Sequence, residues 1–339
     1  MITQTCCPLC LSKPSDKSFL ASSQTYTDAK AIELTVNVCG HCKAYYLADF
    51  VEEENIGEYY PQTYYTKGQS INTSSFGFRV RQSSYSLFKG YPAKNQFSIT
   101  IFLTSILYGI VFWHRWSRFP QYSKHNAKRS ALEVGYGAGR YLMDLNTLGW
   151  DCAGVDVEQS NAEDLVSLGI TVAPSFELLE FKKANVDYIY SYHAFEHIYD
   201  IDSAMTNCHS LLSQDGIFKL CVPMSDGFLP KLFKKYWYDL GVPIHKQIFS
   251  VYGVRLLCRR HGFEIKSYKY NSYSESFIGS LFALVIGFKP DGDRTAQDYT
   301  HSKIFKIICL LVSPLVFFLD LIRLGDRAEF VLIKKIRTK

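Results

Sequence analysis

The chain has 339 residues, a net charge of +5, 47% hydrophobic and 20% charged residues. These values are ordinary for a globular protein and allow one large core with an appendage. The mild positive charge does not by itself argue for nucleic acid, which we do not expect as a partner. The N-terminus MITQTCCPLC lacks a basic region followed by an apolar run. No signal peptide is visible, so we expect a cytoplasmic protein.

The N-terminal block, residues 1–60, contains two cysteine pairs at the C-x-x-C spacing: Cys7, Cys10, Cys39 and Cys42. In a reducing compartment such pairs favour metal ligation over disulfides. The alternating stretch IELTVNV between them is compatible with a hairpin. We predict a zinc-ribbon-like domain with a structural zinc, because four protein ligands leave no open coordination position. Free or redox-active thiols are the alternative, and Cys6 is an alternative ligand to Cys7.

A connector, residues 61–126, follows the ribbon and is rich in aromatic residues. Within it, residues 97–113 read FSITIFLTSILYGIVFW and carry no formal charge. This run is at the short limit for a membrane span. We interpret it as a helix that is either buried against the main domain or lies at a membrane surface, with a true span as the less favoured alternative.

Strands and helices alternate from residue 127 to residue 273, beginning with SALEV and AGRYLMDLNTLG. This alternation predicts an α/β core, a largely parallel sheet with helices on both faces. An apolar helical insertion at 274–325 precedes the last strand and basic tail at 326–339. The insertion has two interpretations: a lid on the sheet, or a peripheral membrane contact through 276–323. In the second, Lys303, Lys306 and Arg323 lie at the head-group level.

The stretch ALEVGYGAGRYLMDLNTLGWDCAGVD, from Ala131 to Asp156, is the most informative part of the core. Its glycines fall where a strand should meet a helix. Such a turn lets a ligand approach the backbone and the amides of the helix N-terminus. Asp156 ends the next strand, where an acidic side chain can accept hydrogen bonds from ribose hydroxyls.

The motifs in this region, taken in order, resemble those of class I methyltransferases that depend on S-adenosylmethionine (SAM). LEVGYGAGR resembles the SAM loop, GVDVEQS the ribose-binding strand end, and DYIYSYHAFEHIYD and QDGIFKLCVP the fourth and fifth strands. The resemblance covers about Ala127 to Asn271 plus the last strand, and implies a Rossmann-like fold. The double C-x-x-C, IHKQIFS and the apolar insertion resemble a bacterial subset associated with surface-polysaccharide or other glycan biosynthesis. Tyr136 departs from the small residue usual at its position, so its ring is expected to point away from the cofactor.

This resemblance implies a set of residues that bind SAM. Glu133 orients the loop or approaches the amino group, Asp156 binds the ribose, and Val157 lies against the adenine. The full implied set is Glu133, Gly135, Tyr136, Gly137, Gly139, Asp156, Val157, Ser175, Phe176, Ser191 and Tyr192.

A methyltransferase must align a nucleophile with the methyl group and, for a hydroxyl, accept its proton. Alignment alone supplies much of the rate, so a base is not required. If one is used, histidine suits neutral pH. The candidates are His193, His197 and His245, with Glu196 as a partner. Because adjacent helical residues do not share a face, we expect one of Glu196 and His197 to brace the turn.

We therefore predict a cytoplasmic SAM-dependent methyltransferase that acts on a sugar hydroxyl of a glycan or glycan precursor, including lipid-linked ones. One alternative is a quinone or another lipid-soluble acceptor, which also fits the apolar segments. Another is a SAM-binding scaffold without turnover. A nicotinamide-dependent oxidoreductase is disfavoured, because Leu142 stands where the dinucleotide motif needs Gly or Ala.

Overall fold

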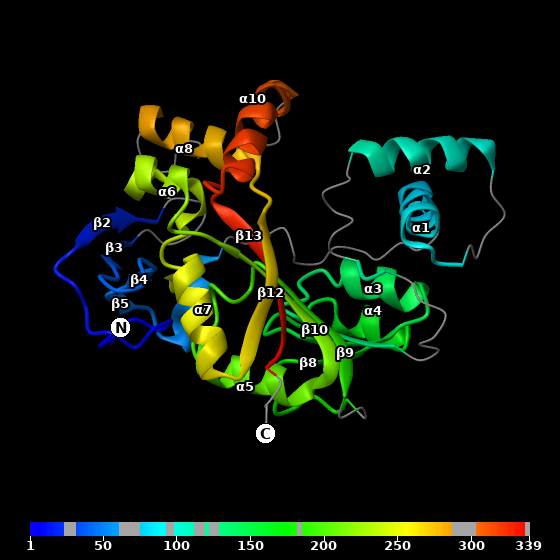
Figure 1. Ribbon diagram of the computed structural model, residues 1–339, viewed down its shortest axis with the longest axis horizontal. Coiled ribbons are helices and arrows are strands. Elements are labelled where there is room, and N and C mark those ends of the chain that lie inside the picture. Colours follow the sequence, from blue (N-terminus) through cyan, green and yellow to red (C-terminus); the bar gives the residue numbers. More distant parts are fainter. Residues whose placement is uncertain are drawn as a thin grey trace. The chain divides into compact units, whose positions relative to one another are not determined.

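The structure is a computed structural model that describes residues 1–23, 32–60, 75–92, 98–111, 119–121, 129–181, 185–286 and 303–335 (Figure 1). Parts of the predicted connector, residues 287–302 of the predicted insertion and residues 336–339 of the predicted basic tail lie outside this description. The chain divides into two compact units. One comprises Met1–Tyr64, Tyr192–His209 and Leu220–Lys339, and the other Tyr65–Ser191 and Ser210–Lys219.

The central sheet has seven strands in the order β12-β13-β10-β9-β6-β7-β8. Their bounds are β6 Ser130–Val134, β7 Asp151–Val155, β8 Thr171–Ala173, β9 Val186–Tyr192, β10 Leu212–Pro223, β12 Phe263–Tyr270 and β13 Arg327–Lys334. β6 runs parallel to β7 and β9, and β7 runs parallel to β8. β12 and β13, side by side in Figure 1, are antiparallel. The Rossmann-like α/β fold is confirmed, with a mixed sheet.

Helices connect the strands of this sheet: α3 Arg140–Thr147, α4 Ala162–Ser167, α5 Ile201–Leu211 and α7 Val251–Arg260. α7 is capped by Ser250, whose side chain accepts a hydrogen bond from the amide of Gly253. This is the bond expected of a serine cap, and it satisfies a donor that the first turn leaves open. The N-cap residue of α4 is Asn161, whose side chain makes no capping hydrogen bond. The amide of the preceding Ser160 donates to the Glu158 side chain at 3.0 Å.

The N-terminal segment forms its own antiparallel sheet, with four strands in the order β11-β4-β3-β2. β2 is Ser18–Ser22, β3 is Glu33–Val38, β4 is Tyr45–Leu47 and β11 is Gln247–Ile248. β1 Ile2–Thr3 pairs with β5 Asp49–Phe50 beside it. The stretch IELTVNV thus contains a hairpin strand, and the edge strand β11 comes from a distant part of the sequence. Val36 and Ile248 pack in one apolar cluster with Trp237, which is 0% exposed.

The apolar insertion is helical. α8 spans Ser274–Ile286 and α10 spans Lys303–Leu321, with Pro314 inside it. Ile278, Phe305 and Cys309 form the buried cluster between them. α6 Phe228–Phe233, η1 Glu53–Tyr59, η3 Lys234–Tyr236 and η4 Tyr238–Leu240 complete this unit.

Two helices, α1 Phe76–Lys89 and α2 Ile99–Val111, precede the glycine turn within the second unit. The Ser84 hydroxyl donates to the carbonyl oxygen of Ser105 at 3.0 Å, and Phe88 packs against Gly109. Asp144 on α3 holds α1 in place. Its buried carboxylate accepts hydrogen bonds from Arg81 at 3.2 Å, from Gln82 at 3.1 Å and from the Tyr85 hydroxyl at 3.1 Å.

Replacing Asp144 with alanine should therefore destabilise the protein. Asp144→Ala leaves several donors without their acceptor, and breaking a buried pair of this kind costs about 3 kcal/mol. The free energy of unfolding from urea denaturation measures the loss. Asp164→Ala, an exposed site on α4, is the control and should change stability by less than about 0.5 kcal/mol. Equal effects of the two changes would contradict this account of Asp144.

Candidate active site

The glycine turn between β6 and α3 has three glycines with positive φ angles: Gly135 at 78°, Gly137 at 50° and Gly139 at 68°. Residues with side chains rarely adopt this conformation. Gly139 also precedes α3 directly, where an added Cβ would lie 2.6 Å from the Leu165 side chain. The turn therefore needs glycine for its backbone path, and at Gly139 also for packing.

The Asp156 side chain, at the end of β7, is hydrogen-bonded to this turn. One carboxylate oxygen accepts a hydrogen bond from the amide of Gly137 at 2.7 Å, and the other accepts one from the amide of Glu158 at 2.9 Å. Burial raises the pKa of Asp156, while these two amides oppose the shift. The predicted ribose ligand thus also shapes the loop, a role that spacing alone did not indicate.

Tyr136, in the middle of the turn, is 4% exposed. An added Cβ on Gly154 in β7 would lie 2.7 Å from a carbon of its ring, so the ring occupies space that this glycine leaves. Burial raises the pKa of Tyr136 to about 12. The large side chain is tolerated in the loop because a strand position beneath it has no side chain.

The other predicted cofactor residues lie at the ends of neighbouring strands. Glu133 on β6 is 5% exposed and lies in register with Tyr190 of β9. The Ser191 hydroxyl donates to the carbonyl oxygen of Val134 at 2.9 Å. Val157 is 80% exposed, as a residue that contacts a ligand face can be. Ser175 and Phe176, after β8, are half-buried.

The segment after β9 gathers the predicted catalytic residues. His193 has a φ of 53°, and its Nδ1 lies 2.8 Å from a carboxylate oxygen of Glu196. The Glu196 carboxylate and the rings of His197 and His245 each offer an atom within 4.8 Å of the others. The structure thus brings all four candidates together. Burial raises the pKa of Glu196 and lowers that of His245 to about 3.

A turn rather than a helix makes this grouping possible. Residues 193–199 form no helix, so the adjacent Glu196 and His197 both reach the cluster. The helical spacing on which our expectation rested does not apply here, and which of the two acts only to brace the turn stays a prediction. The Gln247 side chain holds the turn by donating to the carbonyl oxygens of Phe195 at 2.7 Å and Ile198 at 3.0 Å.

Two further residues near the cluster were missed from the sequence. The Tyr60 hydroxyl lies 3.4 Å from Nδ1 of His197. Arg327, on the last strand, donates to the Tyr192 hydroxyl at 2.5 Å and lies over the Tyr273 ring. Nothing local marks either residue, since each comes from an element far away in the chain. The tyrosine density near residue 60 was the one available signal for Tyr60.

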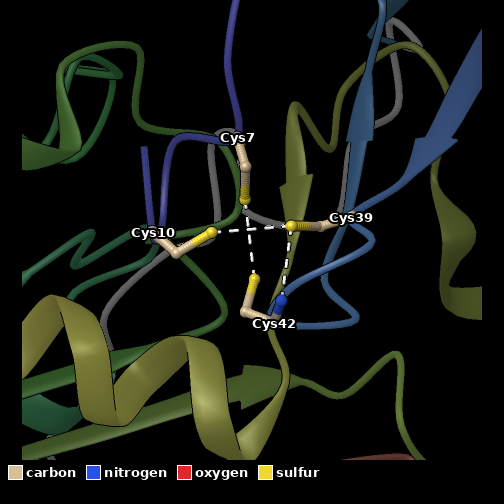
Figure 2. A group of neighbouring side chains, drawn as sticks. All are labelled: Cys7, Cys10, Cys39 and Cys42. Atoms are coloured by element: carbon tan, nitrogen blue, oxygen red, sulfur yellow. Dashed lines mark hydrogen bonds between the residues drawn. The ribbon is translucent and has the colours of Figure 1, made fainter. Parts of the chain in front are cut away.

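The four N-terminal cysteines point toward one another (Figure 2). The sulfurs of Cys7 and Cys42 are 3.6 Å apart, and those of Cys10 and Cys39 are 3.5 Å apart. All four sulfurs lie within 4.8 Å of one another. A tetrahedral zinc with sulfurs at about 2.3 Å needs S–S separations of about 3.8 Å. The donor set therefore fits such an ion, and Cys6 is not part of it.

Hydrogen bonds within this group polarise the thiols. The bond with Cys7 lowers the pKa of Cys42 to about 5 and raises the pKa of Cys7. The amide of Cys42 also donates to the sulfur of Cys39 at 3.4 Å. Amide donors of this kind stabilise thiolates, the form in which cysteine binds metals.

Residues 113–268 match the family model described as a methyltransferase domain. They form a class I SAM-dependent methyltransferase domain. The match covers the glycine turn, Asp156 and the His–Glu turn. None of the curated proteins compared with the sequence matches it.

Solved structures of methyltransferases are similar at low identity. A SAM-dependent methyltransferase from Mesorhizobium loti has 14% identity and a TM-score of 0.41, covering 65% of this chain and 96% of that one. One from Archaeoglobus fulgidus has 17% identity and a TM-score of 0.40, covering 68% and 94%. A mycolic acid cyclopropane synthase complexed with S-adenosylhomocysteine has 17% identity and a TM-score of 0.40, covering 75% and 95%. At these identities and TM-scores, the similarity to solved structures supports no functional conclusion beyond the family match.

Asp156→Asn should weaken SAM binding by this methyltransferase about 10- to 100-fold, because it removes the charge and one acceptor from a site of charge-assisted hydrogen bonds. Calorimetric titration with SAM measures the dissociation constant. Asp164→Asn is the matched control, since its side chain is exposed on α4. Unchanged affinity in Asp156→Asn would remove this residue from the cofactor site.

Proposed function

We propose that the methyltransferase transfers the methyl group of SAM to a sugar hydroxyl of a glycan or glycan precursor, including lipid-linked ones. The observation that carries this proposal is the bond between His193 Nδ1 and the buried carboxylate of Glu196, 2.8 Å long. A hydroxyl must lose its proton when it accepts a methyl group, so a histidine oriented by a carboxylate is suited to this acceptor.

In this proposal His193 is the general base and Glu196 positions it. The Glu196 carboxylate accepts a hydrogen bond from Nδ1–H, so Nε2 is the unprotonated ring nitrogen that would receive the proton of the acceptor. The His193 side chain is 22% exposed, whereas that of Glu196 is 0% exposed. The left-handed backbone of His193 costs about 1 kcal/mol or more, and such conformations concentrate at functional sites.

The acceptor can be identified by incubating the purified protein with isotopically labelled SAM and a glycan and lipid extract of cells that lack it. Label in the glycan fraction supports the proposal. Label in a quinone or other lipid-soluble fraction would support the alternative acceptor, and label in neither fraction would contradict both.

His193→Gln should lower kcat on the labelled acceptor by about 10²- to 10⁴-fold, the usual contribution of a general base. SAM affinity should change little. His261→Gln is the control, since His261 pairs instead with Asp202 on α5 at 2.8 Å. A variant at His193 with unaltered kcat would exclude it as the base.

We further propose that Cys7, Cys10, Cys39 and Cys42 hold a structural zinc. The sulfur separations and the amide donor described above support this ligand set. An ion held by four protein ligands stabilises the fold and takes no part in chemistry.

Purified protein should then contain one zinc ion at the cysteine site. When cobalt replaces the zinc, the protein should show the visible and ultraviolet absorption bands of cobalt bound to thiolates. Cys10→Ser should remove these bands and lower the melting temperature, because structural zinc contributes folding free energy. Cys6→Ser is the matched control and should change neither quantity. Thiolate bands that persist in Cys10→Ser would refute this ligand set.

We also propose that the protein is cytoplasmic and contacts the inner face of the membrane through residues 276–323. One described helix, Ile304–Leu321, is long and apolar enough to cross a membrane, and 22% of it is buried. Its outward side chains include Leu310 at 72% and Leu311 at 74% exposure. Lys306 and Arg323 are exposed at its two ends. An apolar surface of this kind, flanked by cations, suits an anionic lipid surface.

Liposomes of phosphatidylglycerol and phosphatidylethanolamine should carry the protein upward in a flotation gradient. Leu310→Ser combined with Leu311→Ser should reduce the bound fraction at least about tenfold, since each buried leucine contributes about 1.5–3 kcal/mol. Leu20→Ser, on β2 and 56% exposed, is the control. Equal flotation of the double variant and the control would exclude α10 as the contact.

A further inference from the structure

A second group of metal-ligating side chains lies beside the proposed base. One carboxylate oxygen of Glu196 and one ring nitrogen each from His197 and His245 lie within 4.8 Å of one another. The two rings are 4.7 Å apart between centroids and inclined at 70°. None of these residues belongs to the cysteine group.

His245 is held in the tautomer that a metal ligand requires, and His197 is also bonded to a backbone carbonyl oxygen. Nδ1 of His245 lies 2.9 Å from the carbonyl oxygen of Asp239, and Nδ1 of His197 lies 3.2 Å from that of Ile244. A carbonyl oxygen only accepts, so Nδ1 of His245 carries the proton and its Nε2 keeps its lone pair. A backbone carbonyl bound to the far nitrogen is the usual support of a metal-bound histidine.

Glu196 supplies the negative charge. It is 0% exposed, and one of its oxygens accepts the bond from His193. The other oxygen, Oε2, is buried and has no hydrogen-bond partner among the residues that the structure describes. A buried carboxylate oxygen without a partner is costly, and a cation beside it would remove that cost.

We propose that Glu196, His197 and His245 bind a divalent first-row transition-metal ion of the zinc class. Two imidazoles and one carboxylate bind such ions in preference to magnesium or calcium, which favour oxygen ligands alone. Ligand atoms at about 2.1 Å from a tetrahedral ion lie about 3.4 Å from one another. The three atoms here lie within 4.8 Å of one another, so only small side-chain movements would bring them to an ion.

Three protein ligands leave a coordination position open, as in catalytic sites. If the proposed function holds, that position suits the oxygen of the acceptor hydroxyl, and the ion would lower the pKa of the hydroxyl before His193 takes its proton. Metal binding itself does not depend on the identity of the acceptor, so we test it by a readout other than activity.

Cobalt titration of the metal-free wild-type protein provides the test. We expect two equivalents to bind, the first with thiolate charge-transfer bands and the second with only weaker visible bands from nitrogen and oxygen ligands. Metal analysis after zinc loading should likewise give two zinc ions per chain. Saturation at one equivalent with thiolate bands would overturn the proposal.

His245→Asn is the most informative variant. The side-chain amide of the asparagine can still donate to the Asp239 carbonyl oxygen, but it cannot replace Nε2 of the histidine as a metal ligand. It should weaken the second site at least about 100-fold, since even the loss of a supporting contact costs 10- to 100-fold. The first site should be unaffected, which shows that the fold survives. His261→Asn is the control. Unchanged binding of the second ion by His245→Asn would also overturn the proposal.

Discussion

The short segment Ile244–Ser250 joins the N-terminal sheet to the turn after β9, and the rest of the first compact unit depends on this connection. Its backbone pairs with β4 of the N-terminal sheet, Gln247 opposite Tyr46. Its side chains and amides hold the turn after β9: the amide of Lys246 donates to the carbonyl oxygen of Glu196 at 2.9 Å. Gln247 is 1% exposed, so its bonds to this turn are made away from water. Losing a buried bond of this kind costs about 1–3 kcal/mol.

This arrangement makes the cysteine-bearing segment a structural part of the unit that contains the His–Glu turn. Ser250 donates to the carbonyl oxygen of Cys42 at 2.5 Å, and Ser225 to that of Lys43 at 2.9 Å. The Arg260 guanidinium donates to the carbonyl oxygens of Pro8 and Leu9 at 3.1 and 2.9 Å. The backbone that positions the four thiols is therefore bonded to the segment after β10, to α7 and to the segment before α7. An ion at the cysteines would stiffen the same network that orients the His–Glu turn.

The sequence was enough to predict the α/β core, because the alternation of strands with helices and the glycine pattern are local signals. It also identified the residues of the glycine turn and the histidines of the cluster. It did not predict that β11 joins the N-terminal sheet, because a two-residue strand has no periodicity and its partner is about 200 residues away. Asp156 was expected to bind ribose, but its bond to the amide of Gly137 depends on a positive φ that no pattern specifies.

Site geometry was the least predictable part. Glu196 and His197 were judged by helical spacing, which does not apply to the turn that contains them. Tyr136 was recognised as unusual, yet its accommodation depends on Gly154, which reads in the sequence as an ordinary strand residue. Such compensations join residues that are distant in sequence, so only the tertiary structure reveals them.

The bond between Ser250 and Cys42 joins residues 208 positions apart, and this separation has a consequence for synthesis. A ribosome adds about 5–20 residues per second, so Cys42 leaves it about 10–40 s before its partner does. During that interval the N-terminal sheet lacks its edge strand, and its thiols lack the shelter of α7. The nascent chain therefore passes through a stage in which its cysteines are open to oxidation or to capture by foreign metals. Protection of the thiols during translation matters more for this protein than for one whose cysteine-bearing sheet folds without a distant strand.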